Sequence, residues 1–379
     1  MVTPPIKRIF QFNLGAIVTA LLFLCLGSGN LYAQAVGIDS ITTSLSYNSG
    51  SSVTLNDTTT TMDTADLAIT GMTDTNGNTY TVTGLSTTAI LRTDSTSTGE
   101  LNQTSAWYMG NAQSTAGDDP TTLYSTYNSG NPASLLLGNN VLDGADNVFI
   151  NSSSTSAAQG NVERLDFLYN GTTGITDTNN LAIGVFDRGT GDAFSVAVIT
   201  GIDSNGNPTS YGAFITVSNT AFTGTNLLTT ANTDTSSGVT LLNAGGEPTD
   251  YLVRYDSSTS MVTSNVTDDN QTNTQNINGV VFTLASLGIT SGTTVYGYSL
   301  MGGDVTPGTN LNSLTNTANT AVFKTTTTDS GAFDGLDPVA VNGVLFTLHA
   351  VPEPSTYAEV FLVGALALYG WRRHRKRAD

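Results

Sequence analysis

Hydrophobic and polar residues alternate over much of the chain between residues 36 and 350. This two-residue period is typical of a β-strand with one buried face, whereas no stretch of this region has a convincing helical period. Thr, Val, Tyr and Phe are abundant and Lys is scarce, which also favours strand. The clearest alternating runs are Leu165, Phe167 and Tyr169; Leu181, Ile183 and Val185; Phe194, Val196 and Val198; Tyr211, Ala213, Ile215 and Val217; and Tyr251, Val253 and Tyr255.

Turn residues separate these runs and predict hairpins. One hairpin is expected to reverse at 48–50 (Asn-Ser-Gly), followed by a polar loop over 56–64. A clearer hairpin spans 67–85 and turns at 74–78, where Asn-Gly supplies the positive φ angles of a type I′ turn. The same Asp-x-Asn-Gly-Asn sequence recurs at 203–207, between two alternating runs.

A short repeat lies near the end of this region. Residues 278–284 read NGVVFTL and residues 342–348 read NGVLFTL. The repeat predicts two equivalent strands, each entered from an Asn-Gly turn, and is too short to indicate a solenoid.

Many short strands joined by turns predict an all-β, sandwich-like body over residues 36–350, and jelly-roll and immunoglobulin-like topologies are both compatible with the pattern. A body of about 315 residues is long enough for one large β domain or two smaller ones. The small, polar segment 152–160 is the best candidate for an internal boundary.

The first 35 residues have the composition of an export signal. Lys7 and Arg8 precede an apolar stretch over 14–26, and Ala33-Gln34-Ala35 provides small residues for cleavage. Cleavage there would leave a mature chain that starts at Val36. Because the single cysteine, Cys25, lies within the signal, the mature chain would have no thiol or disulfide chemistry.

The last 29 residues contain three consecutive segments with different properties. Pro352, Glu353 and Pro354 form an extended segment without amide donors at its prolines. An apolar run over 357–371 predicts a short transmembrane helix. The basic residues that follow would hold its far end in the cytoplasm; they are Arg372, Arg373, Arg375, Lys376 and Arg377.

These three parts together resemble the PEP-CTERM sorting signal of Gram-negative bacteria. The resemblance implies processing by an exosortase, a membrane-embedded cysteine transpeptidase, and a link to exopolysaccharide and biofilm. Two features depart from the pattern: Glu359 lies within the apolar run, and the run is short. Fifteen helical residues rise about 22 Å against a hydrocarbon core of about 30 Å, a gap that snorkelling arginines and local thinning can close.

Charge narrows the range of partners. The chain has 12 Lys and Arg and 30 Asp and Glu, of which seven and three lie in the terminal signals, so the body keeps five and 27 and carries about −22. Such a surface disfavours nucleic acid and anionic membrane. It is compatible with divalent cations and with a hydrated polysaccharide matrix.

The body offers little for catalysis. Its only histidine is His349, which argues against a Ser-His or Cys-His nucleophile and against zinc. Its three glutamates are in no recognisable catalytic context. Arg164 and Asp166 share one face of a strand and are expected to form a surface ion pair, and Arg188 is expected to pair with a nearby aspartate in a turn.

Calcium is the one candidate cofactor. Two turns place oxygen ligands at alternate positions, as hard cations prefer: Asp74, Asn76 and Asn78, and Asp203, Asn205 and Asn207. Both lack the acidic residue that ends an EF-hand loop, and both are good hairpin turns without metal. The simpler interpretation is a plain turn, with no resident cofactor.

The sequence therefore predicts a non-enzymatic, exported protein that crosses the inner membrane and reaches the cell surface or extracellular matrix. A carbohydrate-binding module is the alternative, with Tyr211, Tyr251 or Trp107 as an exposed sugar platform. A polysaccharide hydrolase, which would need an acidic pair in a cleft, is the third possibility.

Overall fold

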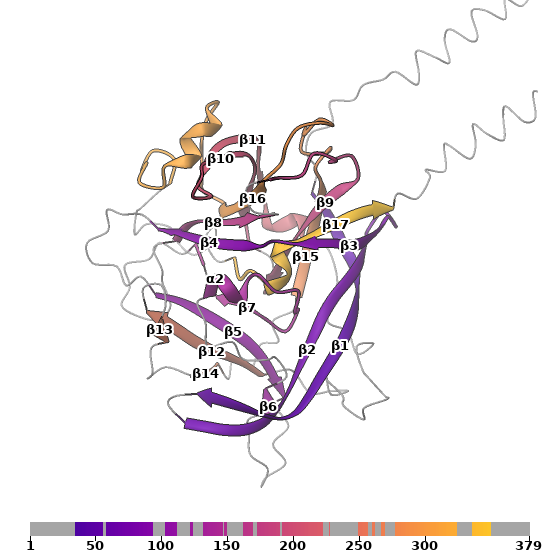
Figure 1. The fold of residues 1–379 in the computed structure, drawn as a ribbon, viewed down its shortest axis with the longest axis vertical. Helices are drawn as coiled ribbons and strands as arrows, with labels where there is room; N and C mark the ends of the chain where they lie inside the picture. Colours follow the sequence, from indigo (N-terminus) through magenta and orange to yellow (C-terminus); the bar gives the residue numbers. More distant parts are fainter. Residues whose placement is uncertain are drawn as a thin grey trace, which may run out of the picture. The chain divides into compact units, whose positions relative to one another are not determined.

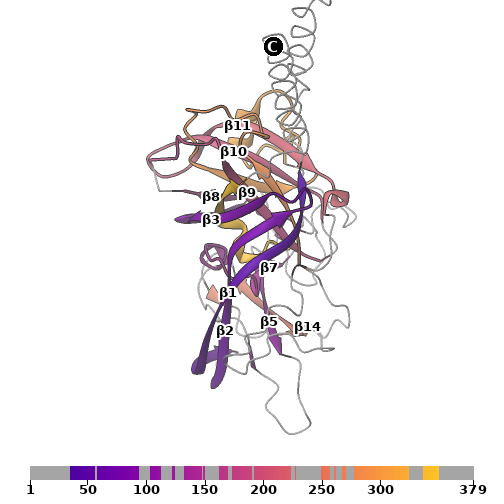
Figure 2. The same cartoon turned by 90° about the vertical axis from the view of Figure 1, so that its right-hand side faces the viewer.

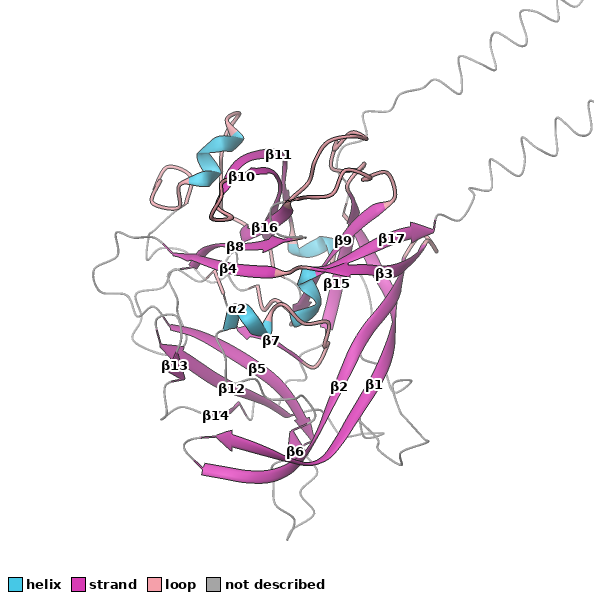
Figure 3. Ribbon diagram, viewed as in Figure 1, coloured by secondary structure: helices cyan, strands magenta, loops and turns pink. Residues whose placement is uncertain are grey.

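The computed structural model describes residues 35–55, 58–93, 103–111, 122–123, 132–146, 148–149, 162–169, 173–189, 192–222, 227, 249–256, 260–261, 267–269, 277–323 and 336–349. The chain divides into two units, Met1–Tyr32 and Ala33–Asp379, and every described residue belongs to the second. Strands dominate this part of the chain (Figure 3). Its helices are the four-residue α2 (Pro132–Leu135) and three short 3-10 turns. The all-β prediction is confirmed.

Six antiparallel strands close on themselves into a barrel (Figure 1). In order around the barrel they are β1 (Val36–Leu55), β15 (Ile277–Thr283), β9 (Leu181–Arg188), β17 (Val344–His349), β3 (Thr79–Leu85) and β2 (Thr58–Asp74). β1 closes the ring because its first residues, Val36 and Gly37, pair with β15, whereas from Ile38 onward it pairs with β2, with an irregularity at Asp39. The jelly-roll and immunoglobulin-like sandwiches that the sequence suggested do not describe this closed arrangement.

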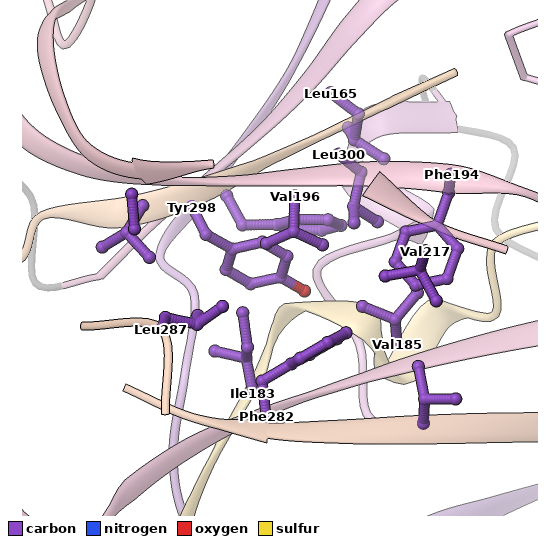
Figure 4. Packing of buried hydrophobic residues seen from close by; sticks show 14 of the residues in the cluster. Leu165, Ile183, Val185, Phe194, Val196, Val217, Phe282, Leu287, Tyr298 and Leu300 are labelled. Atoms are coloured by element: carbon purple, nitrogen blue, oxygen red, sulfur yellow. The ribbon is translucent and has the colours of Figure 1, made fainter. Parts of the chain in front are cut away.

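A second sheet has the order β11 (Pro208–Val217), β10 (Phe194–Ile202), β16 (Gly297–Gly302), β8 (Val162–Leu168) and β4 (Thr88–Thr93). The main core lies between this sheet and one wall of the barrel (Figure 4). Phe194, Val196 and Tyr298 face Val185 and Phe282 across it. The alternating residues of the runs at 165–169, 181–185 and 194–198 all lie in this core, as their period predicted.

Two further cores flank the main one. Residues of all six barrel strands form a second core on the opposite side of β9, where Ala182 and Phe186 alternate with Ile183 and Val185 of the main core. A third core covers the other face of the second sheet, with Leu314 and Phe323 from the segment 303–323. Both β9 and β10 are therefore buried on both faces.

A third sheet contains β13 (Ser260–Met261), β12 (Thr249–Asp256), β5 (Gln103–Asn111) and β6 (Thr122–Leu123). β14 (Thr267–Asp269) pairs with β12, and β7 (Asp143–Asp146) pairs with β5. In the register of β5 with β12, Tyr108 is opposite Tyr251 and Trp107 is opposite Leu252.

The first predicted hairpin is wrong in its position. β1 continues through 48–50, where the Asn-Ser-Gly sequence is taken up as a register irregularity against β2. The chain reverses instead between Leu55 and Thr58, which are directly paired. The threonine-rich stretch that was expected to be a loop forms the start of β2, since Thr is a good strand former.

The repeated segments form β15 and β17, which lie on either side of β9. They are not equivalent. Asn278 is a strand residue of β15, opposite Asp187, whereas Asn342 lies in the 3-10 turn η3 (Ala340–Gly343) that precedes β17. The prediction that an Asn-Gly turn introduces each strand therefore holds only for the second copy.

The export signal, the possible boundary at 152–160 and the tail at 351–379 lie outside the described residues. Within the described residues, no helix has the length and apolar character to cross a membrane.

Candidate functional site

The residues that are predicted to form the sorting signal lie outside the described part of the chain. They are Pro352, Glu353 and Pro354, together with the basic cluster at 372–377. The candidate sites that the structure describes are polar groups of the body.

The two aspartate turns have the same internal bonding. Asp74 Oδ1 accepts from the backbone amides of Asn76 and Asn78, both at 2.9 Å, and Asp74 Oδ2 accepts from Asn78 Nδ2 at 3.0 Å. In the other turn, Asp203 Oδ1 accepts from the amides of Asn205 and Asn207 at 2.8 Å, and its Oδ2 accepts from Asn207 Nδ2 at 2.7 Å.

The turns are three-residue hairpin loops rather than the predicted type I′ turn. Gly77 N donates to Asp74 O at 2.9 Å, so Thr75 and Asn76 occupy the central positions, and Gly77 follows with φ 85°. Gly206 follows its turn in the same way, with φ 79°. This is a type I turn completed by a left-handed glycine.

Each aspartate oxygen is thus already an acceptor for a donor of the same turn. These hydrogen bonds, above all the one from the Asn207 side chain, lower the pKa of Asp203. Asp74 also accepts from Tyr80 Oη at 2.8 Å, and burial with this bond raises the pKa of Tyr80. The two turns belong to different sheets, and among the described residues no group of three or more His, Cys, Asp or Glu is arranged to hold a metal ion.

A network of charged side chains lies on the covered face of the second sheet. Asp166, whose side chain is fully buried, accepts from Arg164 Nε at 2.7 Å and from Arg92 Nε at 3.0 Å. Ser299 Oγ also donates to Asp166 Oδ1 at 2.6 Å. A second Arg164 nitrogen donates to the backbone oxygen of Leu314. The expected surface ion pair is therefore wrong: Arg164 and Asp166 share a strand face, but segment 303–323 covers it.

Tyr211 extends the same network. Its hydroxyl lies 3.1 Å from Ser299 Oγ, and its ring lies under the Arg164 guanidinium at 5.9 Å. Burial raises the pKa of Tyr211, and Asp166 raises it further. Because Tyr211 is buried, it does not serve as a sugar platform. Trp107 and Tyr251 lie in the third sheet, and their side chains are outside the described part of the structure.

Another buried polar group, around Asp187, joins the end of β9 to the segment before η3. Asp187 Oδ1 accepts from Asp337 N at 2.8 Å, and Asp187 Oδ2 accepts from Asp192 N at 3.2 Å. Burial and the neighbouring Asp192 carboxylate raise the pKa of Asp187 to about 7. Arg188 donates to Asp337 Oδ2 at 3.4 Å, an aspartate 149 residues away in the chain.

A hollow of about 550 Å³ opens beside the end of β11. One wall is Ile215–Ser218 with Thr220 and Ala221, and the other is the start of β1, Ala35–Gly37. Thr75 and Asn76 of the first aspartate turn complete it. Its lining is backbone, hydroxyl, amide and small apolar groups, with no ionisable side chain among the residues that line it.

Sequence reasoning missed the burial of Arg164 and Asp166 and their link to the half-buried Arg92. One signal was available: the body has only five cations for 27 acids, yet one of them, Arg164, lies directly beside the regular run at 165–169. Cations that scarce are rarely placed in a strand without an acidic partner.

Comparison of the chain with protein-family models, curated protein sequences and solved structures finds no match.

Proposed function

We propose that this chain is an exported, non-enzymatic β-rich protein of the cell surface or extracellular matrix, sorted through its C-terminal segment by an exosortase-like transpeptidase. The observation that carries the proposal is the order of three parts: Pro352-Glu353-Pro354, the apolar run 357–371 and the basic cluster 372–377. The apolar run forms a transmembrane helix during transit, and the basic cluster holds its end in the cytoplasm.

The order of parts distinguishes sorting from simple anchoring. A permanent anchor needs an apolar span and flanking charge, and gains nothing from a proline-rigid segment outside the bilayer. A processing enzyme does gain, because an unpaired and extended backbone enters its site at little cost in ordering. Pro352 and Pro354 keep the segment extended, and the basic cluster sets its height above the membrane.

The described body supports a structural role. Two of its buried carboxylates are held by groups far away in the sequence: Asp166 accepts from Arg92, and Asp187 accepts from the backbone amide of Asp337. Groups held in this way stiffen a scaffold rather than present a reactive atom to solvent. The body charge of about −22 keeps such a protein soluble and suits a hydrated polysaccharide matrix.

The test is the mass of the C-terminus in surface-released protein. Replacing Pro352, Glu353 and Pro354 with alanine should leave membrane insertion intact and block maturation. A double change of Ser355 and Thr356 to alanine is the matched control, because it alters the adjacent positions and keeps both prolines; it should mature normally. Mature protein that still carries Trp371 and the basic cluster would overturn sorting and favour a plain anchor.

A further inference from the structure

β11 ends its sheet, and its outer edge has no strand partner among the described residues. In both views β11 lies beyond β10, at the margin of the fold (Figure 2). An open edge presents a row of backbone donors and acceptors that can pair with another strand.

Half of this edge is protected and half is not. Pro208 begins β11, and an irregularity follows at Gly212, since Val198 pairs with Ala213 while the next residue, Ile199, pairs with Tyr211. Proline and a bulge are two ways in which an edge strand avoids pairing. From Ala213 to Val217 the register is regular, and this stretch (AFITV) contains no proline, glycine or charge.

Two hydrophobic cores reach the unprotected stretch. Ile215 packs against the main core, and Phe214 packs against the core on the other face of the sheet. Both side chains are half-buried, so each core ends at this edge in an apolar side chain that is not fully covered.

A hollow also lies next to part of this stretch. The hollow of about 550 Å³ starts at Ile215 and continues past Ser218. The other wall of this hollow is the start of β1, with Thr75 and Asn76.

We propose that β11 pairs antiparallel with β11 of a second copy of this chain, about a two-fold axis at Ile215. The stretch is self-complementary, because a two-fold axis at Ile215 sets Ala213 opposite Val217 and Phe214 opposite Thr216 in both directions. The second copy brings the same apolar pair and so continues both cores. Two bodies of about −22 repel each other, and this uncharged seam lets them meet without opposed carboxylates.

A symmetric disulfide tests the register. In the full chain, purified in mild detergent and carrying Cys25→Ser, the change Ile215→Cys places the two introduced thiols directly opposite each other. Mild oxidation should then convert most of the protein to a covalent dimer. Thr209→Cys, on the protected half of the same strand, should remain monomeric on a non-reducing gel because it has no symmetry mate nearby. Failure of the Ile215→Cys variant to form a covalent dimer, or equal cross-linking by both variants, overturns the proposal.

Light scattering after gel filtration tests the association itself. The unmodified chain should have twice the monomer mass, and Thr216→Lys should weaken the dimer at least about tenfold, because it places a charge on the seam. Thr209→Lys makes the same change at another exposed threonine of β11 and should remain dimeric. If the unmodified chain is a monomer at about 100 µM, the proposal is wrong. It is also wrong if Thr216→Lys and Thr209→Lys weaken the dimer equally while the two variants have the same thermal midpoint.

Discussion

The side-chain amide of Asn342 pairs with the backbone of Phe186 as a neighbouring strand would. Phe186 N donates to Asn342 Oδ1 at 2.7 Å, and Asn342 Nδ2 donates to Phe186 O at 3.0 Å. β17 pairs with β9 from Leu345 opposite Ile183, and continuing this register would set residue 342 opposite residue 186. The side-chain amide of Asn342 thus takes the place of the backbone hydrogen bonds that β17 would make with β9 at this position, where the chain forms η3 instead.

Replacing Asn342 with alanine should lower the free energy of unfolding by roughly 2–3 kcal/mol, because it leaves the buried amide of Phe186 without a partner. Phe186 O would keep only its bond from Val339 N, at 3.3 Å. Asn278 is the matched control. It holds the same place in the repeat but is half-buried and donates once, to Gly189 O at 2.9 Å. Asn278→Ala should cost about 1 kcal/mol. Urea denaturation of both variants measures the difference, and equal losses would contradict the role of Asn342.

The repeat also shows the limit of local sequence. Two nearly identical segments predicted two equivalent strands, and both do flank β9. However, Phe282 is opposite Ile183, whereas in the second copy that position is taken by Leu345. Because of this one-residue offset, the side chain of Phe282 lies in the main core, whereas that of Phe346 lies in the second core, which the six barrel strands form. Register depends on long-range pairing, and a shift of one residue exchanges the faces.

Alternation predicted strand faces well where strands were regular. It failed for Tyr211, which was grouped with Ala213, Ile215 and Val217 but lies in the core on the opposite face. The irregularity at Gly212 causes the change. A glycine inside a strand pattern is a recognised sign of a bulge, so this change of face could have been predicted.

The sequence placed Arg164 and Asp166 on one face but did not indicate which groups cover that face. The groups that cover it are distant in the chain: Leu314 accepts from Arg164, and Ser299 donates to Asp166. No pattern within a strand indicates which distant segment covers it, so these partners could not be identified from the sequence.

The two arginines of this network should differ in their effect on stability. Arg164 is 3% exposed and Arg92 is 23% exposed at the side chain. Arg164→Met should cost roughly 3–5 kcal/mol, as expected for removing one partner of a buried ion pair, and Arg92→Met about 1–2 kcal/mol. Thermal or urea unfolding would show the difference. A larger loss for Arg92→Met would mean that Arg92 is the main partner of Asp166.

Asp187 should make the protein less stable as the pH rises. Its pKa is raised from 3.8 to about 7 in the folded state, so between these values the folded protein holds a proton that the unfolded chain has lost. The stability contributed by this proton is complete below about pH 4 and disappears as the pH rises through about 7. Two charged groups act on Asp187: Asp192 raises its pKa, and Arg188 lowers it.

The measurement is the free energy of unfolding at about pH 5 and about pH 8. Asp187→Asn resembles the protonated side chain, so its stability relative to the native chain should rise over this interval, by up to about 1.4 kcal/mol per pH unit. Asp39→Asn, a change at an exposed acid, should leave the native pH profile in place. If Asp187→Asn and the native chain lose stability in parallel, Asp187 is ionised throughout.

The aspartate turns should fold and hold without calcium. In both, the carboxylate oxygens accept donors of the same turn, so hydrogen bonds hold the turn together without an ion. Unfolding midpoints in calcium and in chelator should therefore agree. A shift above about 10 °C, equivalent to a few kcal/mol for a chain of this size, would instead establish a metal site.

The same hydrogen bonds predict an asymmetry between the two turns. Asp74 is buried and also accepts from Tyr80, so Asp74→Ala should cost roughly 2–3 kcal/mol of unfolding free energy. Asp203→Ala, at a solvent-facing turn with the same Asp-x-Asn-Gly-Asn pattern, should cost clearly less. Urea denaturation of the two variants provides the comparison. Equal losses would mean that the turn bonds alone, and not the contact with Tyr80, determine the stability of both hairpins.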